Sequence, residues 1–261
     1  MQNKVVVVTG ASSGIGAVLA EQLGARGARV VLVARREREL REIASKIGER
    51  ASVSVADVTQ REAVERVARD TLAELGQLDV WVNNAGRGIS RMVSELNDDD
   101  FDEMMLINVK SALYGMQAVL PHFRAQGRGH IINVSSMLGR VPMAPFRSAY
   151  SAAKHALNAL TANLRMELRA FPEIHVSAVH PGVVATDFGS SALHGGIDSR
   201  SLPGAQTPQE VAAAIVETIE RPRADVYTRP GAKQLVLSYY GADDMGDMEQ
   251  SPPFQLPARS T

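Results

Sequence analysis

The stretch Val5-Val6-Val7-Val8-Thr9-Gly10-Ala11-Ser12-Ser13-Gly14-Ile15-Gly16 joins an apolar run to a glycine-rich turn. Four consecutive valines suit a strand that is covered on both faces of a sheet. The glycines allow a tight turn, and the helical pattern that follows would direct backbone N–H groups at a phosphate. The spacing matches neither Gly-x-Gly-x-x-Gly nor a Walker-A loop. The stretch therefore indicates a strand–turn–helix unit that could bind a nucleotide, although such turns also occur without a ligand.

The same alternation continues along the chain. Helical patterns such as Gln60–Leu75 lie between most of the apolar runs, and Thr207-Pro208-Gln209-Glu210 has the pattern of a helix start before Pro208–Glu220. The predicted strands are residues 4–8, 29–33, 52–56, 80–83, 130–134, 174–179 and 225–228. Strands that alternate with helices indicate βαβ units. We expect one doubly wound α/β domain of the Rossmann type, with about seven parallel strands and helices on both faces.

Two segments depart from this alternation. Residues 187–206 are rich in glycine and serine and have the character of a mobile loop, whereas residues 241–261 show no periodicity and read as a C-terminal tail. No linker divides the rest of the chain. We therefore expect a single domain over residues 1–240.

Composition excludes several classes of function. The chain has 261 residues, a formal charge of −1 and no cysteine, which leaves no global positive field for nucleic acid and no thiolate chemistry. The six histidines show no metal-ligand spacing, so no metal is expected. No apolar run approaches the ~18 residues of a membrane span, and Met1–Lys4 is not a signal sequence. We expect a cytoplasmic protein with neither a nucleic-acid nor a membrane partner.

The ends of the predicted strands carry the polar residues, and ligands of parallel sheets bind at this edge. The second strand is followed by Ala34-Arg35-Arg36, with no carboxylate to repel a 2′-phosphate. We expect Arg35 to bind that phosphate and Arg36 to assist, although both could belong to a solvated helix start. Other strand ends carry common turn formers: Asp57-Val58, Asn83-Asn84-Ala85-Gly86, Ser135-Ser136 and Pro181-Gly182.

Tyr150 and Lys154 lie four residues apart at the start of a predicted helix, Tyr150–Leu168, and so share one helix face. Ser136, at the end of a strand, would bring a hydroxyl to the same sheet edge, which completes an acid–base set. An ammonium ~4 Å away favours a phenolate by about 4 kcal/mol at most. We therefore expect Lys154 to lower the pKa of Tyr150 toward neutrality.

Together these residues resemble the short-chain dehydrogenase/reductase family, in its main branch, over about Lys4 to Gly231. The motifs are weak alone and specific in this order: Thr9–Gly16, Asp57, Asn83–Gly86, Asn108, Ser136, Tyr150 with Lys154, and Pro181-Gly182. The resemblance implies an NADP(H)-dependent oxidoreductase that interconverts a carbonyl and a secondary alcohol. The alternatives are an NAD(H)-dependent enzyme of the same family and a non-catalytic nucleotide-binding regulatory or scaffold protein.

The resemblance also implies a role for each residue. Tyr150 would be the acid and base, Ser136 would hold the substrate oxygen, Lys154 would bind the nicotinamide ribose, and Asn108 would hold a water that relays protons. Hydride would pass directly between nicotinamide and substrate. The implied cofactor-binding residues are Gly10, Ser12, Ser13, Gly14, Ile15, Gly16, Arg35, Arg36, Asp57, Val58, Asn84, Ala85, Gly86, Tyr150, Lys154, Pro181, Gly182, Val184 and Thr186.

By the same resemblance, residues 187–206 would form a lid over a small-molecule substrate. A homodimer or homotetramer would pair the helices near Phe101–Leu120 and Tyr150–Leu168, where Ala152, Ala153, Ala156 and Ala159 are small.

Some features depart from the family pattern. The interval from Ser136 to Tyr150 is one residue longer than usual, which we place in residues 141–147; Ser135 is the alternative catalytic serine. Ser13 stands where many NADP-dependent members carry a basic residue. We expect Asp98-Asp99-Asp100 to cap and charge a helix N-terminus. Four side chains flank the predicted catalytic elements and could line an apolar pocket: Met137, Met143, Phe146 and Phe188.

Overall fold

The computed structural model of the protein describes residues 1–254. Seven parallel strands form one sheet in the order β3-β2-β1-β4-β5-β6-β7. The strands are β1 Val5–Thr9, β2 Arg29–Ala34, β3 Ala51–Val55, β4 Val80–Asn83, β5 Gly129–Val134, β6 Ile174–His180 and β7 Asp225–Tyr227. The expected doubly wound α/β fold is therefore confirmed, with strand bounds within two residues of those predicted.

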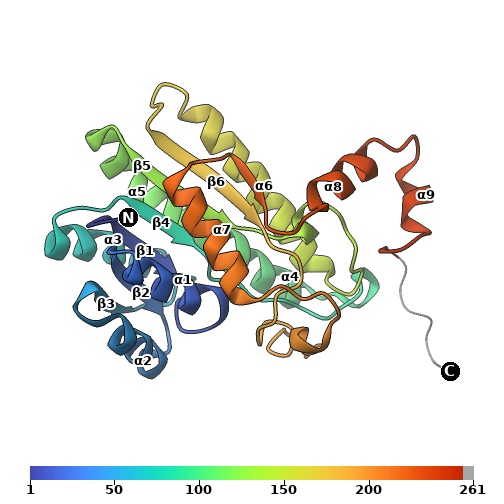
Figure 1. Cartoon of the computed structure of the whole chain (residues 1–261). Coiled ribbons are helices and arrows are strands. Elements are labelled where there is room, and N and C mark those ends of the chain that lie inside the picture. The colour runs from blue at the N-terminus through green and yellow to red at the C-terminus, as the bar shows by residue number, and fades with distance from the viewer. Residues whose placement is uncertain (255–261) are drawn as a thin grey trace.

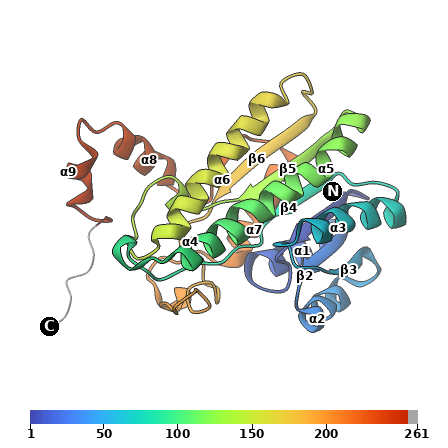
Figure 2. The same ribbon diagram turned by 180° about the vertical axis from the view of Figure 1, so that it is seen from behind.

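Helices cover both faces of the sheet. On one face lie α1 (Gly14–Ala25), α2 (Glu37–Ile47) and α7 (Pro208–Glu220), as Figure 1 shows. Figure 2 shows the other face, with α3 (Arg61–Leu75), α4 (Asp98–Met105), α5 (Ser111–Gln126) and α6 (Ser148–Glu167). The valines of β1 alternate between the two layers, since Val6 and Val8 pack with α1 whereas Val5 and Val7 pack with α3 and α5. This burial on both faces explains the uninterrupted apolar run.

The chain order of the strands reverses direction between β1 and β4. The connections from β1 run outward to β3, and the chain then returns to β4 on the other side of β1. Ligands of open α/β sheets bind at the carboxyl ends of the strands at such a point. The topology thus brings the glycine turn after β1 and the segment Asn84–Gly86 after β4 to one place.

The C-terminal segment is more structured than the sequence indicated. Beyond α8 (Ala232–Tyr240), a short helix α9 covers Met245–Glu249, and Phe254 is buried. The Phe254 ring stacks on Tyr239, and the pair packs with Met137 and Val141 beside the end of β5. Figures 1 and 2 show α8 and α9 as an arm at the rim of the domain. Residues 241–254 of the expected tail thus contain a short helix and a buried ring, and residues 255–261 lie outside the described part of the chain.

Within residues 1–254, no helix combines the length and the hydropathy that a membrane span requires.

Candidate active site

The glycine turn after β1 is locked to the segment after β4. The hydroxyl of Thr9 accepts hydrogen bonds from the backbone N–H groups of Asn84 (3.0 Å) and Ala85 (3.1 Å), and the Asn84 amide donates to the Thr9 carbonyl at 2.9 Å. Gly10 has φ +67°, and a Cβ there would lie 2.9 Å from the Cα of Ala85. A Cβ on Gly16 would clash with the carbonyl oxygen of Gly10. These contacts require glycine and leave a backbone cradle at the N-terminus of α1, which fits a dinucleotide pyrophosphate.

Two arginines follow β2, and they point to different partners. The Arg36 guanidinium donates to the hydroxyls of Ser12 (2.9 Å) and Ser13 (2.7 Å) in the glycine turn. Arg35 instead lies 3.9 Å from the carboxylate of Asp57. The structure thus places Arg36, the residue expected to be secondary, beside the glycine turn. Its position as the residue before α2 directs it back across the end of β1.

Asp57 and Val58 follow β3. The Asp57 carboxylate accepts from the backbone N–H of Thr59 at 3.0 Å and from its hydroxyl at 2.8 Å, which fixes the turn. Val58 is buried. Asp57 lies next to Arg35, the first residue of the arginine pair.

Asn108 lies in a π-helical turn, Leu106–Lys110, that joins α4 to α5. Its amide makes two hydrogen bonds with the backbone of Arg87: Oδ1 accepts from the Arg87 N–H at 3.2 Å and Nδ2 donates to the carbonyl at 2.9 Å. A Cβ on Gly86 would lie 2.8 Å from Asn108 Oδ1 and 3.6 Å from Lys154 Nζ. The Asn108 side chain therefore holds the segment after β4 close to Lys154. Wide π-helical turns are frequent at functional sites.

The two hydroxyls of the predicted catalytic set lie near each other. The Ser136 side chain is close enough to Tyr150 to lower its pKa, and Ser136 Oγ accepts from the backbone N–H of Leu138 at 3.1 Å. Ser135, the alternative catalytic serine, has a buried hydroxyl with no hydrogen-bond partner within residues 1–254. The geometry thus favours Ser136.

The pKa values of the buried pair differ from the expectation. Burial raises the pKa of Tyr150 to about 12, which outweighs the lowering by the Ser136 side chain and by the charge of Arg147. Burial also lowers the pKa of Lys154 to about 8. Lys154 Nζ donates to the Val134 carbonyl at 2.9 Å and lies 5.6 Å from the centre of the Tyr150 ring. The expected lowering of the Tyr150 pKa by Lys154 is therefore wrong for the protein alone, because desolvation of the buried phenol dominates its pKa.

Residues after β6 bridge the two halves of the site. The backbone N–H of Met137 donates to the Pro181 carbonyl at 2.8 Å, so the Pro181-Gly182 turn lies beside Ser136. Val184 pairs with Gln206 across the segment that follows. Thr186 reaches the glycine turn, since a Cβ on Gly14 would lie 3.3 Å from its methyl carbon. The predicted nicotinamide-end residues thus connect the glycine turn with Ser136.

The segment of residues 187–206 is tied to residues 88–91. Leu193 donates its N–H to the Gly88 carbonyl at 2.9 Å, and Ser90 donates to the Leu193 carbonyl at 2.9 Å. His194 Nε2 lies 2.6 Å from Asp100 Oδ1 at the start of α4. The capping prediction is corrected here: Asn97 caps α4 through the N–H of Asp100, and the Asp100 carboxylate pairs with His194.

The four candidate pocket side chains separate into two groups. Phe188 packs edge-on against the Tyr150 ring, with centroids 5.4 Å apart. Phe146 lies beneath the Arg147 guanidinium, 5.3 Å from its ring centre. Met137 and Met143 pack instead with the C-terminal arm. Of these four side chains, Phe188 is the one that packs with Tyr150.

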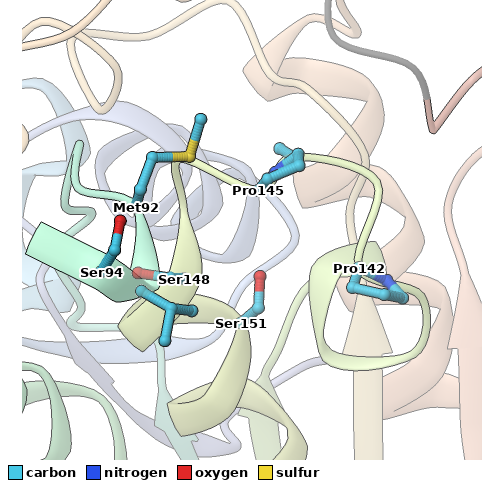
Figure 3. Close-up of a pocket in the computed structure, with 8 residues that line it drawn as sticks. Met92, Ser94, Pro142, Pro145, Ser148 and Ser151 are labelled. Carbon is cyan, nitrogen blue, oxygen red and sulfur yellow. The ribbon is translucent and has the colours of Figure 1, made fainter. Parts of the chain in front are cut away.

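A pocket of about 630 Å³ opens on a neighbouring face of α6 (Figure 3). Ser148 and Ser151 line it together with Met92, Val93, Ser94, Pro142, Ala144 and Pro145. Tyr150 and Lys154 are not among its lining residues. The sequence did not indicate this pocket, and it adds no group to the predicted catalytic set.

Arg147 lies near Tyr150, and the sequence did not indicate a role for it. It lies three residues before Tyr150 and so shares its helix face, a spacing that could have drawn attention to it. Its positive charge is close enough to lower the pKa of Tyr150.

The family model described as short chain dehydrogenase matches residues 4–195. An uncharacterized oxidoreductase of Staphylococcus epidermidis is 38% identical over 195 residues, which cover 72% of this chain and 84% of the relative. A metagenomic short-chain oxidoreductase, solved in complex with NADP, is 33% identical, with a TM-score of 0.74 over 88% of this chain and 98% of that chain. A Burkholderia phymatum short-chain dehydrogenase/reductase, solved in complex with NAD, shares the fold at 24% identity, with a TM-score of 0.86 and 98% of each chain covered. The chain therefore belongs to the short-chain dehydrogenase family, whose members are NAD(P)-dependent oxidoreductases.

Proposed function

We propose that this oxidoreductase interconverts a carbonyl and a secondary alcohol with NADP(H), and that Asn108, Ser136, Tyr150 and Lys154 form its catalytic set. One observation carries the proposal: Ser136 and Tyr150 lie together in a buried site, close enough for Ser136 to lower the pKa of Tyr150, and one helical turn from Lys154. The expected nucleotide cradle lies at the same edge of the sheet.

The chemistry divides between cofactor and protein. The reduced nicotinamide, when bound, supplies the hydride that reduces the carbonyl carbon, and it is oxidised in the same step. The Ser136 hydroxyl holds the carbonyl oxygen and stabilises its developing charge. Tyr150 gives its proton to that oxygen, which completes the alcohol. A Tyr150 pKa of about 12 keeps the proton on the phenol at neutral pH, as an acid in the reducing direction requires.

Lys154 and Asn108 support this proton transfer. A pKa of about 8 lets Lys154 exchange a proton near neutral pH, so it can restore the proton that Tyr150 loses. Asn108 holds Gly86 next to Lys154 through its bonds to Arg87. Removal of the Asn108 amide would therefore release the loop that lies beside Lys154.

Preference for NADP(H) is supported by the serines of the glycine turn. Ser12, Ser13 and Arg36 form one hydrogen-bonded group beside the turn, and two hydroxyls with a guanidinium suit a phosphate. Arg35 is nearby and largely exposed. The NADP bound to the metagenomic relative agrees with this choice, whereas an NAD(H) enzyme would not need the group.

The proposal also includes a lid over the substrate. Residues 187–206 would form it, because they are hydrogen-bonded to residues 88–91 and because Phe188, which lies within them, packs against Tyr150.

Subunits would associate through α5 and α6 as a homodimer or homotetramer. Ala152 and Ala159 are exposed on α6 and available for such contact, but Ala153 is fully buried within the domain and is not.

The test is NADPH oxidation with a panel of aldehydes and ketones, compared between wild type and Tyr150→Phe. Loss of the proton donor is expected to lower kcat at least about 100-fold, the size of general acid catalysis. Calorimetric titration should show NADPH binding to both proteins within about threefold, with NADPH at least tenfold tighter than NADH in wild type, which corresponds to about 1.4 kcal/mol. Equal turnover by the two proteins would refute the catalytic set, and tighter NADH binding would refute the cofactor preference.

A further inference from the structure

Arg147 lies at the N-terminus of α6, on the wall of the site that Tyr150 and Phe188 form. Its Nη1 donates to the Ile89 carbonyl at 3.0 Å. A Cβ on Gly88 would lie 3.0 Å from Arg147 Nη1 and 3.0 Å from a ring carbon of Phe188. Phe188 in turn packs against the Tyr150 ring. The guanidinium is thus one side chain removed from the proposed proton donor.

Among residues 1–254, no carboxylate lies within 4.0 Å of the Arg147 guanidinium. Four other arginines near the site are paired: Arg87 with Glu103 at 2.6 Å, Arg91 with Asp100 at 4.0 Å, Arg140 with Asp225, and Arg200 with Asp187 at 2.8 Å. Arg229, beside the Pro181-Gly182 turn, also has no ion pair within the described residues, but its side chain is exposed to solvent. Arg147 is half-buried, and burial lowers its pKa. A desolvated cation without an anion is costly, and its retention indicates that a ligand supplies the anion.

The guanidinium keeps donors that no residue of the described part of the chain accepts from. A guanidinium has five N–H donors, and the bond to Ile89 uses one of them. Glycines let the backbone approach both edges of the group closely: Gly88 beside Nη1, and Gly196, where a Cβ would lie 3.1 Å from Nη2. A planar guanidinium with free donors binds a carboxylate through two parallel hydrogen bonds.

We propose that the substrate carries a carboxylate that binds Arg147 while its carbonyl oxygen is held by Ser136 and Tyr150, an inference that rests on the carbonyl–alcohol activity proposed above. The enzyme is then an oxidoreductase of oxo acids and hydroxy acids rather than of neutral ketones. Phe188 provides the apolar surface for the chain between the two groups.

The experiment compares oxo acids with their methyl esters, which keep the carbonyl and remove the charge. The pairs are 4-oxopentanoate and 4-acetylbenzoate, each with its methyl ester, and the readout is NADPH oxidation. Wild type should favour the acids about 10- to 100-fold in kcat/KM, the size of hydrogen bonds to a charged group. Arg147→Met should abolish this preference by raising KM for the acids, with the esters changed less than about threefold. Arg147→Lys, which keeps the charge, should restore part of the preference.

Arg91→Met is the matched control. Arg91 pairs with Arg147 in a β-bridge, but its charge is balanced by Asp100. Its loss should affect acid and ester alike and leave their ratio within about twofold. Equal loss for acid and ester in Arg147→Met would overturn the proposal, because it would show that the arginine only supports the Ile89 backbone. A preference of wild type for the esters would overturn it as well.

A binding measurement separates this proposal from the proposed function. Calorimetric titration of the NADP⁺-loaded protein with 4-acetylbenzoate should show binding that weakens at least about tenfold in Arg147→Met. The affinity for NADPH should be equal in the two proteins. If the acid binds through Arg147 but no oxo compound is reduced, the proposed reaction fails and the anion site stands. If no acid binds to wild type, the anion site fails whatever the turnover of the esters.

Discussion

The proposed nucleotide half and the proposed substrate half of the site are built in different ways. The nucleotide half consists of β1 to β4 and the turns that follow them, and many of its contacts come from backbone atoms and glycines within short motifs. The substrate half combines the starts of α4 and α6 with residues 187–206, segments brought together from far apart in the chain. The first arrangement suits a ligand that is common to a family. The second varies with the side chains that meet, and these set which substrate fits.

The glycine turn provides the strongest test of this difference. Gly10→Ala places a Cβ 2.9 Å from the Ala85 backbone and strains φ +67°, so stability should fall by about 2–3 kcal/mol and NADPH affinity at least about 30-fold. Gly76→Ala is the matched control, because Gly76 has φ +71° but no atom within 4 Å of the new Cβ. It should cost about 1 kcal/mol and leave NADPH affinity unchanged. Urea unfolding and calorimetry measure both effects, and equal loss of binding in the two variants would contradict the assignment of the cradle.

In the substrate half, the buried Lys154 makes the stability of the fold depend on pH. The pKa of Lys154 is about 8 in the folded protein and about 10.4 when unfolded, so between these values the unfolded chain binds more protons. Stability should therefore rise with pH from about 8 to 10, by about 2 kcal/mol in the urea-unfolding free energy. Below pH 8 the lysine is protonated in both states and contributes no slope.

Lys154→Met should flatten the rise in the urea-unfolding free energy between pH 8 and 10. Above pH 10 the raised pKa of Tyr150 acts in the opposite direction, because the folded state then keeps the phenol proton longer than the unfolded chain. An unchanged slope in Lys154→Met would show that another group causes the pH dependence.

The arginine pair after β2 gives the smallest of the three effects. Arg36→Met removes the guanidinium from Ser12 and Ser13 and should weaken NADPH about tenfold while NADH changes little. Arg35→Met, which removes an exposed side chain beside Asp57, should weaken NADPH less than about threefold. Calorimetry at two salt concentrations should show that the loss of NADPH affinity in Arg36→Met is smaller at high salt. The reverse order of the two variants would return the phosphate contact to Arg35.

Much of the nucleotide half could be predicted because its signals are local. The valines of β1, the glycine turn and Asn84–Gly86 each read as part of a motif, and the structure brings them together through Thr9. The sequence did not show which of the two arginines, Arg35 or Arg36, contacts the glycine turn. It depends on which side chain crosses to the serines of another turn, and no residue spacing along the chain encodes that.

In the substrate half, the four-residue spacing indicated Tyr150 and Lys154 as a pair. It did not indicate the pKa values of their side chains. Attraction between the groups was visible in the sequence, whereas the burial that raises one pKa and lowers the other was not.

The helix at Met245–Glu249 could not be predicted for a similar reason, because it depends on tertiary packing. Its short segment has no pattern of its own, and Phe254 is buried only because Tyr239 and Met137 are nearby.

The sequence by itself determined the parallel sheet, the glycine turn and the order of polar residues along its edge, since these follow from periodicity and from what a glycine allows. Tertiary structure alone decided which charges remain without partners. Arg91 and Arg147 are the same residue type and neighbours in a β-bridge, yet Asp100 balances one and no described residue balances the other. Compensation of a charge depends on distance and desolvation in the folded chain, and neither quantity is set by local sequence.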